Sequence, residues 1–414
     1  MLEVHLMQSS VQWGPPPDGL PGSQDDVSFR VEAPMVRAED WQSASAASMS
    51  VEQAGGFTIR RRGIIAEPEP GNPHETWGIL NPGAARGRDG QLYLFPRVVA
   101  EGNYSRIALA RVLFDARGRP SGIERLGYAL EPSEPYERNP QSGGGCEDAR
   151  VTYLRPLDLY VMTYTAYTVL GPRIALAISD DLFTWQRLGL LRFAPGCSVD
   201  FSAYGNKDAL FFPEALTDEH GHQSLVLIHR PTYQVAQADG TVHVIVPRGV
   251  MERRQSLWMS HLSLEQAQRD PDTLTWIEDT HLLVTPQQPW ESIKIGGGAP
   301  PVLTHHGWLV IYHGVSGRLV EGACFQTELR YAVGVLIMDT THAGSVLYRS
   351  ATPLLTPELE EEREGIVPNV VFPTGIDQRP EAGDPDGFDL YYGMADTRIG
   401  VARLSIPTTL SHGS

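Results

Sequence analysis

Two short runs decide the fold: Tyr160-Val161-Met162-Thr163-Tyr164 and, after a turn, Arg173-Ile174-Ala175-Leu176-Ala177. The first run is rich in β-branched and aromatic residues and has a tyrosine at its end. The turn between them contains Gly171 and Pro172, which are typical of strand boundaries. The pair therefore predicts two neighbouring β-strands of one sheet.

The same pair of runs recurs along the chain, giving five copies. The other four are Leu92–Phe95 with Arg106–Ala110, Leu225–His229 with Ser256–Ser260, Trp308–Tyr312 with Tyr331–Val335, and Phe388–Tyr392 with Arg398–Ala402. Radial repetition of a multi-strand unit leaves only short, protected strand edges. The sequence thus predicts an all-β chain folded as a five-bladed β-propeller. A double-sheet sandwich is the alternative, but it would not explain five similar units.

The first 55 residues differ from the rest. Proline and small polar residues punctuate them at Gly14–Pro17 and Ser43–Ser48, with little hydrophobic periodicity. We expect residues 1–55 to form a partly irregular N-terminal extension and residues 56–414 to form the propeller domain. No long amphipathic helix is expected anywhere.

Composition limits the partners and the compartment. With 41% hydrophobic and 20% charged residues the chain is typical of soluble domains, and its formal net charge of -17 argues against nucleic acid or an anionic membrane surface. Three cysteines fit neither a disulfide framework nor a zinc motif. The N-terminus lacks a secretion signal and no apolar run is long enough to span a bilayer, so a cytoplasmic protein is expected.

Polar residues stand near the same strand in each copy, where a propeller would direct them to one axial pocket. They are Arg97, Asp148, Arg150, Lys207, Glu214, His229, Arg230, Lys294, Tyr312, His313 and Asp396. In Glu147-Asp148-Ala149-Arg150, Asp148 is placed to donate or relay a proton. The alternative is a turn in which Asp148 caps a strand and Arg150 makes a surface ion pair.

Four cationic or titratable groups come from different copies: Lys207, Arg230, Lys294 and His313. If they meet on the axis, they form an oxyanion pocket in a protein that is acidic overall. Lys294 also precedes three glycines, whose backbone amides can face an anion. A tight turn is the plainer interpretation of those glycines, as a structural role is for a histidine at a strand end.

Many separated motifs follow one another in a fixed order. They are Leu80–Ala84, Ser105–Ala110, Glu147–Thr152, Met162–Tyr167, Gly171–Ala177, Asn206–Ala209, Phe212–Glu214, His229–Pro231, Lys294–Gly296, Ile311–Gly314, Val367–Pro373 and Tyr391–Thr397. From about Arg60 to the C-terminus, this series resembles glycoside hydrolase family 130, the mannoside phosphorylases and related β-mannosidases.

The resemblance implies a five-bladed propeller that cleaves a β-mannoside with inversion. Asp148 matches the general acid of the phosphorylases, which passes its proton through a mannose hydroxyl. Phosphate then attacks the anomeric carbon and α-mannose 1-phosphate is released. Phosphate is a co-substrate, and neither a further cofactor nor a metal is expected.

The resemblance also assigns the binding residues. Phosphate binding falls on Lys207, Arg230, Lys294, His313 and Tyr331. Substrate binding falls on Asn81, Arg97, Arg106, Glu147, Arg150, Tyr164, Glu214 and Asp396. Among the aromatic residues nearby (Trp77, Tyr104, Tyr164, Tyr167, Phe372 and Tyr392), some would stack on a sugar and at least half would be core.

Two departures from the family pattern stand out: Ala149 replaces the usual proline, and residues 232–254 look like an insertion that shapes the acceptor side. An inverting β-mannosidase is an alternative function, with Glu214 as the extra acid that activates water. A non-catalytic sugar-binding propeller is another, since propellers host many functions. The expected partners are a mannoside and phosphate, and assembly into a homo-oligomer is left open.

Overall fold

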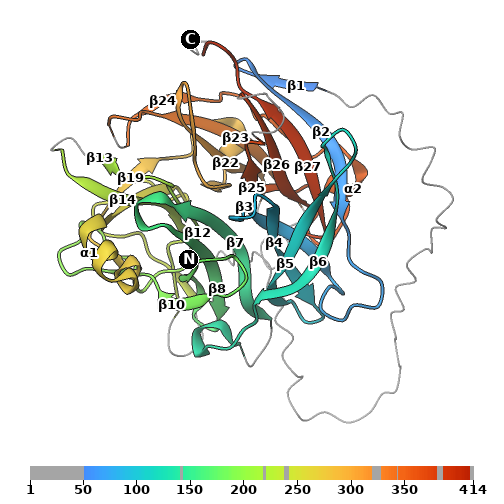
Figure 1. Cartoon of the computed structure of the whole chain (residues 1–414). Helices are drawn as coiled ribbons and strands as arrows, with labels where there is room; N and C mark the ends of the chain where they lie inside the picture. The colour runs from blue at the N-terminus through green and yellow to red at the C-terminus, as the bar shows by residue number, and fades with distance from the viewer. Residues whose placement is uncertain are drawn as a thin grey trace, which may run out of the picture.

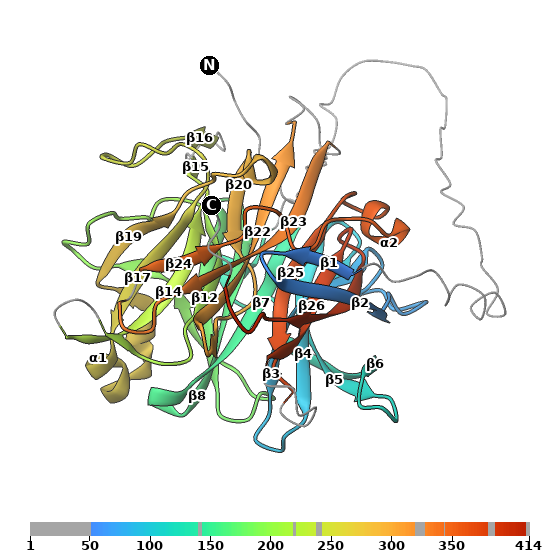
Figure 2. The ribbon, with the colours of Figure 1, turned by 90° about the horizontal axis from the view of Figure 1, so that it is seen from above.

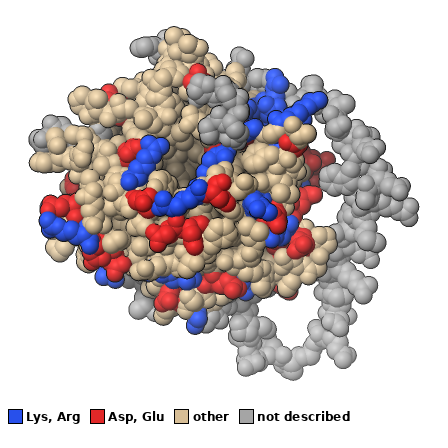
Figure 3. Space-filling model, viewed as in Figure 1, with Lys and Arg blue, Asp and Glu red and all other residues tan. Residues whose placement is uncertain are grey.

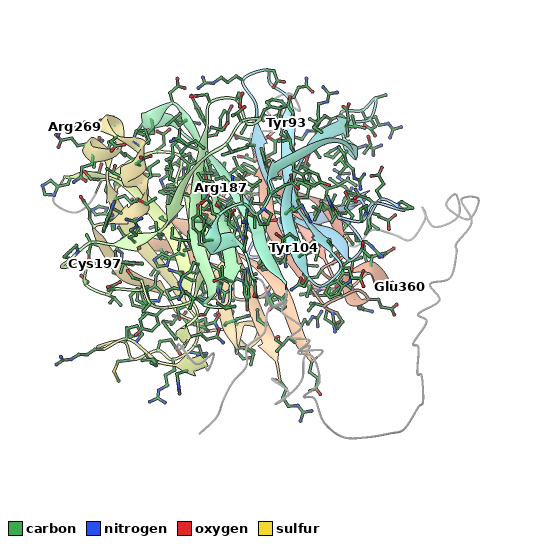
Figure 4. All side chains as sticks on the ribbon, turned by 90° about the horizontal axis from the view of Figure 1, so that it is seen from below. Tyr93, Tyr104, Arg187, Cys197, Arg269 and Glu360 are labelled. Atoms are coloured by element: carbon green, nitrogen blue, oxygen red, sulfur yellow. The ribbon has the colours of Figure 1, made fainter. Side chains whose placement is uncertain are left out.

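The computed structural model describes residues 51–139, 143–217, 221–236, 242–318, 328–342, 344–379 and 386–410. Within these ranges strands dominate, and the α-helices are short: α1 (Leu264–Arg269) and α2 (Glu360–Arg363) (Figure 1). Arg269 on α1 and Glu360 on α2 lie at opposite edges of the molecule (Figure 4). The predicted all-β class is confirmed. The predicted extension falls almost entirely on residues 1–50, outside the described residues.

The main strands form five successive antiparallel units, and a short parallel pairing of Tyr104 and Ser105 with Gly144 and Gly145 joins the first two into one sheet. The first contains β3 (Gly78–Arg86), β4 (Leu92–Ala100), β5 (Tyr104–Phe114) and β6 (Pro120–Leu130). The second contains β7 (Gly144–Leu154), β8 (Leu159–Thr168), β9 (Gly171–Ser179) and β10 (Gln186–Leu190), and the third β12 (Asn206–Phe211), β14 (Gln223–Pro231), β17 (Leu257–Ser263) and β19 (Asp279–Val284). The fourth contains β20 (Lys294–Gly297), β22 (Gly307–Gly317), β23 (Leu329–Met338) and β24 (Val346–Arg349).

The fifth unit joins strands from distant parts of the sequence. It contains β25 (Val371–Asp377), β26 (Gly387–Met394), β27 (Arg398–Ser405), β2 (Phe57–Ala66) and β1 (Val51–Ala54). The antiparallel register of β2 with β27 pairs Arg61 with Ala402. The sheet is therefore completed by two segments that lie almost the whole described chain apart.

The first strands of the units contact one another in cyclic order. β3 contacts β25 and β7, β7 contacts β12, β12 contacts β20, and β22 beside β20 contacts β25. In Figure 1, β3, β7, β12 and β25 lie toward the middle of the molecule, and β6, β19 and β24 lie toward the outside. This order agrees with the five-bladed propeller, which stays a prediction.

The remaining strands are short. They are β11 (Arg192–Phe193), β13 (Leu216–Thr217), β15 (Gln234–Ala236), β16 (Val242–Val244), β18 (Trp276–Ile277) and β21 (Val302–Thr304). β15 and β16 pair with each other within the predicted insertion, and they stand at one edge of the molecule in Figure 2. No helix of the described residues is long and apolar enough to cross a membrane.

A buried glutamate–tyrosine–arginine cluster recurs in three units and explains the tyrosines at the strand ends. In the second unit, Glu137 accepts hydrogen bonds from Tyr164 Oη at 2.5 Å and from Arg187 Nε at 2.8 Å. The same carboxylate accepts from the backbone N–H groups of Ser133 and Glu134, which lie before a short helical turn. Burial would raise the pKa of Glu137, but these hydrogen bonds hold it below its usual value.

The other two clusters repeat this geometry. In the fourth unit, Glu291 accepts from Tyr312 Oη at 2.6 Å and from Arg349 Nη2 at 2.6 Å. In the fifth, Glu362 accepts from Tyr392 Oη at 2.9 Å and from Arg61 Nε at 2.8 Å. All three glutamates are fully buried, so each charge is both paired and hydrogen-bonded, as buried charges require.

Candidate active site

Backbone irregularities aim the central polar side chains. The register of the first strand shifts between Leu80 and Gly83 in β3, between Glu147 and Arg150 in β7, and between Lys207 and Leu210 in β12. Each shift contains one residue with positive φ: Asn81 (45°), Asp148 (49°) and Asp208 (56°). Asn and Asp tolerate the left-handed region better than other side chains, and bulges turn a side chain out of the regular alternation. A bulge that contains one residue with positive φ therefore occurs in the first strand of three neighbouring units.

Asp148 is fixed by residues of the first unit. Its Oδ1 accepts a hydrogen bond from Asn81 Nδ2 at 2.9 Å and lies 3.5 Å from Arg97 Nη1. The Arg97 guanidinium also donates from Nη2 to Glu147 Oε1 at 2.9 Å and from Nε to Ser105 Oγ at 2.8 Å. The predicted residues Asn81, Arg97, Glu147 and Asp148 are thus brought together by the structure.

Burial and charge shift the pKa values of this carboxylate cluster. Burial raises the pKa of Asp396 to about 6; Arg97 opposes the shift and the charge of Asp148 adds to it. Burial also raises the pKa of Glu147, against the pull of Arg97 and Lys207. A carboxyl group with a pKa near 6 is half protonated at pH 6, so Asp396 can carry a proton in the pH range in which general acids usually work.

A cationic pocket adjoins the carboxylates. It is lined by Lys207, Arg230 and Lys294 together with Tyr167, Pro172, Thr232, Gln234 and Gln255. Lys207 and Arg230 face each other across β12 and β14. Because Lys207 acts on the pKa values of both Glu147 and Asp396, the pocket lies within electrostatic reach of the acid cluster.

Lys294, which lines this pocket, and His313 are both buried. Burial holds the pKa of Lys294 well below its usual value, and Arg230 and Lys207 lower it further. Its Nζ lies 5.3 Å from the centroid of the Tyr331 ring, in a cation–π contact. Burial likewise lowers the pKa of His313, and neither of its ring nitrogens has a hydrogen-bond partner within the described residues. The ring of His313 packs on Phe372, with the centroids 4.5 Å apart.

The glycines after Lys294 allow close packing. A Cβ on Gly296 would lie 2.4 Å from both Asp208 Oδ2 and His313 Cε1. The carbonyl oxygens of Gly297 and Gly298 accept hydrogen bonds from Arg150, and the Gly298 amide donates to Ile311 within the sheet. The prediction that these amides face an anion is therefore wrong for Gly298. The absence of a side chain at Gly296 instead makes room for Asp208 and His313.

Three residues predicted to bind substrate lie elsewhere. Tyr164 is buried in the core and donates to Glu137, and the partly exposed Glu214 pairs with Arg155. Arg106 pairs with Glu131 at 3.1 Å and lies over the ring of Tyr104, which Figure 4 labels. We place these three outside the cluster because each is held by its own local partner. Tyr392, expected as a stacking or a core residue, belongs to the core cluster of Glu362.

Sequence reasoning missed several residues of the site. Ser105 orients Arg97, Gln255 accepts from Arg230, and Asp208 lies between Arg230 and Arg150. An aspartate inside an apolar strand was the available signal for Asp208, since a buried charge needs a specific partner. The insertion contributes Thr232 and Gln234 to the pocket, and Ala149 is fully buried. No group of three potential metal ligands occurs within the described ranges.

On the face seen in Figure 3, basic and acidic side chains lie next to one another around a hollow near the middle. The net negative charge of the chain is therefore compatible with local positive regions. This agrees with the pairing of Arg97 with Glu147 and of Arg230 with Asp208 deeper in the molecule.

Comparison with known proteins gives consistent matches. The family model described as beta-1,4-mannooligosaccharide phosphorylase matches residues 65–411. The chain is 30% identical over 300 residues to the 1,2-beta-oligomannan phosphorylase of Thermoanaerobacter sp. (strain X514), covering 69% of this chain and 79% of that one. It is 28% identical to the beta-1,2-mannobiose phosphorylase of Listeria innocua serovar 6a, over 66% of this chain and 62% of the relative.

Solved structures share the fold. The Listeria innocua beta-1,2-mannobiose phosphorylase in complex with beta-1,2-mannobiose aligns with a TM-score of 0.52 at 24% identity, over 86% of this chain and 88% of that one. A structure described with GH130 glycoside hydrolases that target beta-1,2-mannosidic linkages in Candida mannan aligns with a TM-score of 0.56 at 20% identity, over 87% and 97% of the two chains. At such identities the likeness concerns the fold alone.

Proposed function

This chain belongs to glycoside hydrolase family 130, and we propose that it cleaves a β-mannoside with inorganic phosphate, releasing α-mannose 1-phosphate and a free sugar. The named relatives are phosphorylases of β-1,2- and β-1,4-linked mannosides, which supports phosphorolysis over other reactions. In this proposal the five antiparallel units are the blades of a propeller, and the first strands carry the reacting groups around its axis.

In the proposed reaction Asp148 is the general acid. The contacts from Asn81 and Arg97 fall on Oδ1, and in this proposal Oδ2 carries the proton. The proton passes through a mannose hydroxyl to the glycosidic oxygen while a phosphate oxygen attacks the anomeric carbon from the opposite face. The bond between that carbon and the leaving sugar breaks, and the configuration inverts.

One observation carries the choice of phosphate: Lys207, Arg230 and Lys294 line a single pocket next to the carboxylate cluster. Arg230 and Lys207 lower the pKa of Lys294 by repulsion, and a bound oxyanion would relieve that repulsion with charge-assisted hydrogen bonds. His313 and Tyr331 stand behind the pocket, and Phe372 packs against both rings. All five predicted phosphate-binding residues therefore gather in one region.

A hydrolase is less well supported. An inverting hydrolase needs a second carboxylate that activates water, with the two carboxyl groups about 6.5–9.5 Å apart. Glu214, the predicted candidate, pairs with Arg155. Asp208 lies near the pocket, but its carboxylate is held by Arg230 and Arg150. Each of the two carboxylates is thus paired with arginine, which favours a structural role over that of a base.

The decisive experiment runs the reaction in the synthetic direction. The enzyme is given α-mannose 1-phosphate with glucose, N-acetylglucosamine, mannose or short mannosides, and phosphate release is followed. Release with one acceptor is expected, and it identifies the leaving-group sugar at the same time. Silence with every acceptor, together with mannose liberated from β-mannosides in phosphate-free buffer, would overturn phosphorolysis in favour of hydrolysis.

A further inference from the structure

Asp208 is a buried carboxylate for which the proposed reaction has no direct use. It lies in the bulge of β12 with a φ of 56°, and only 1% of its surface is exposed. Burial alone would raise its pKa, but Arg230 first and then Arg150 and His313 hold the pKa well below the usual range. Asp208 is therefore a fixed negative charge beside the pocket. A negative charge is not expected there, because it would repel a bound anion.

One side of Asp208 faces the cationic pocket. Its Oδ2 accepts a hydrogen bond from Arg230 Nε at 2.7 Å, while Arg230 Nη1 donates to Gln255 Oε1. Two contacts on different edges fix the plane of a guanidinium group. Asp208 and Gln255 thus determine which way Arg230 faces within the pocket.

The other side of Asp208 leads to the acid. Its Oδ1 lies 3.5 Å from Arg150 Nη2, and Arg150 Nη1 donates to the backbone carbonyl of Asp148 at 2.7 Å. Asp148 has a φ of 49°, and such strained conformations persist only where the surroundings hold them. Arg150 also donates from Nε to the carbonyl of Gly298 at 3.2 Å, so its own position is fixed from the fourth unit.

We propose that Asp208 is a positioning residue that joins the phosphate pocket to the general acid, orienting Arg230 directly and the backbone of Asp148 through Arg150. The proposal rests on the proposed function, because it assumes that phosphate occupies the pocket. It assigns no proton transfer to Asp208. The missing side chain at Gly296 is part of the same arrangement, since it lets Asp208 and His313 approach to an Oδ2–Nε2 distance of 3.7 Å.

Replacing Asp208 with asparagine separates positioning from charge. Electrostatics alone predicts that Asp208→Asn tightens phosphate binding, because a negative charge next to the pocket is removed. Positioning predicts the opposite, because Arg230 loses the ionised partner of a charge-assisted hydrogen bond. The sign of the change in phosphate affinity therefore decides between the two.

The test measures binding of inorganic phosphate by calorimetry and steady-state kinetics in both directions. For Asp208→Asn we expect phosphate affinity to fall about tenfold or more and kcat at saturating phosphate to fall about tenfold. The matched control, Asp272→Asn, changes an exposed aspartate and is expected to leave both values within about twofold of wild type. Phosphate affinity that is unchanged or increased in Asp208→Asn would overturn the proposal, whatever the change in kcat.

Two further variants test the contacts of Asp208 with Arg230 and with Arg150 separately, and they replace Asp208→Asn if that variant fails to fold. Arg230→Lys keeps the charge but loses the planar contacts, so phosphate affinity should fall while kcat at saturation changes little. Arg150→Lys should lower kcat while phosphate affinity stays within about threefold. If Arg150→Lys alters only phosphate affinity or neither value, Asp208 has no path to the acid. Wild-type enzyme that neither binds nor releases phosphate would refute the proposed function, a result distinct from a silent Asp208→Asn in an active phosphorylase.

Discussion

Asn81 and Asp148 face each other from two bulged strands, and the amide of Asn81 donates to the carboxylate of Asp148 across 2.9 Å. Both residues have positive φ, so each bulge turns its side chain toward the other. The contact links the first strand of one unit to the first strand of the next. The proposed acid is therefore positioned by backbone geometry on two strands at once.

Replacing Asn81 with aspartate should shift the pH dependence of the reaction. Aspartate has the same shape and also tolerates the left-handed region. A second carboxylate beside Asp148 would place two like charges next to each other, which disfavours ionisation of the pair. The basic limb of the pH profile of kcat should therefore move upward by about one unit. An unchanged basic limb would show that Asp148 is not the essential acid of the reaction.

Asp148→Asn should lower turnover strongly and leave phosphate binding in place. Asparagine keeps the size of the side chain and cannot donate the proton, and general acid catalysis typically contributes about 10²–10⁴-fold. We expect kcat to fall by that factor, with phosphate affinity from calorimetry within about threefold of wild type. A sugar-binding protein without catalysis would show no activity to lose, and retained activity would transfer the acid role to another group.

Gly296→Ala should damage the phosphate pocket specifically. The added Cβ would collide with Asp208 and His313, so the two side chains must separate. We expect the KM for phosphate to rise about tenfold or more. The displaced charged groups would lose hydrogen bonds, and the loss of one such bond lowers affinity by about that factor. Gly122→Ala is the matched control, because a Cβ there meets nothing within 4 Å. Equal phosphate kinetics in the two variants would contradict this account of the glycine run.

Asp396 should make the stability of the enzyme depend on pH. Its pKa of about 6 in the fold lies above the ordinary value of 3.8, so the folded state binds the proton more tightly. The contribution of this tighter proton binding to the free energy of unfolding is fully present below pH 3.8 and is lost as the pH rises through 6. Asp396→Asn, neutral at every pH, should therefore be more stable than wild type at pH 8, by about 1–2 kcal/mol after allowance for partial exposure.

Urea unfolding of wild type and Asp396→Asn at pH 8 and pH 4.5 provides the measurement. The difference in the free energy of unfolding should shrink to less than half at the lower pH. A difference that is the same at both values would show that Asp396 is ionised at a normal pKa in the fold.

Arg61→Ala should destabilise the fold strongly. Its guanidinium is the buried partner of the Glu362 carboxylate, and removing it leaves a buried charge without that ion-pair partner. Such losses cost about 3–5 kcal/mol in the free energy of unfolding. Arg318 makes the same kind of two-point contact with Glu328 on the surface, so Arg318→Ala should cost less than about 1 kcal/mol. Chemical denaturation of both variants tests this, and similar costs would refute a structural role for the buried cluster.

The repeat made much of the site predictable. Residues at equivalent places in successive copies meet because each copy forms one antiparallel unit, and Lys207, Arg230 and Lys294 were expected together on that basis. Arg97 and Asp148 were expected in one axial pocket by the same argument, and they lie 3.5 Å apart. For these residues, their equivalent positions in the repeat are enough to predict that they lie close together.

The direction of side chains was harder to predict. Tyr164, Arg106 and Glu214 lie near the right strands, yet each is turned to a local partner: Glu137, Glu131 or Arg155. A shift of one residue in a strand exchanges its two faces, and the bulges that produce such shifts have no clear sequence signature.

The pairing of β2 with β27 has a consequence for how the protein is made. During synthesis β2 leaves the ribosome early, but its partner strand is nearly the last to appear, so one edge of β2 must wait without its hydrogen bonds. β25 contacts β3, the strand that carries Asn81, so the acid site is also assembled late. The newly made chain therefore has most of its units before it has a working enzyme, and a chaperone that shelters exposed strand edges would act during that interval.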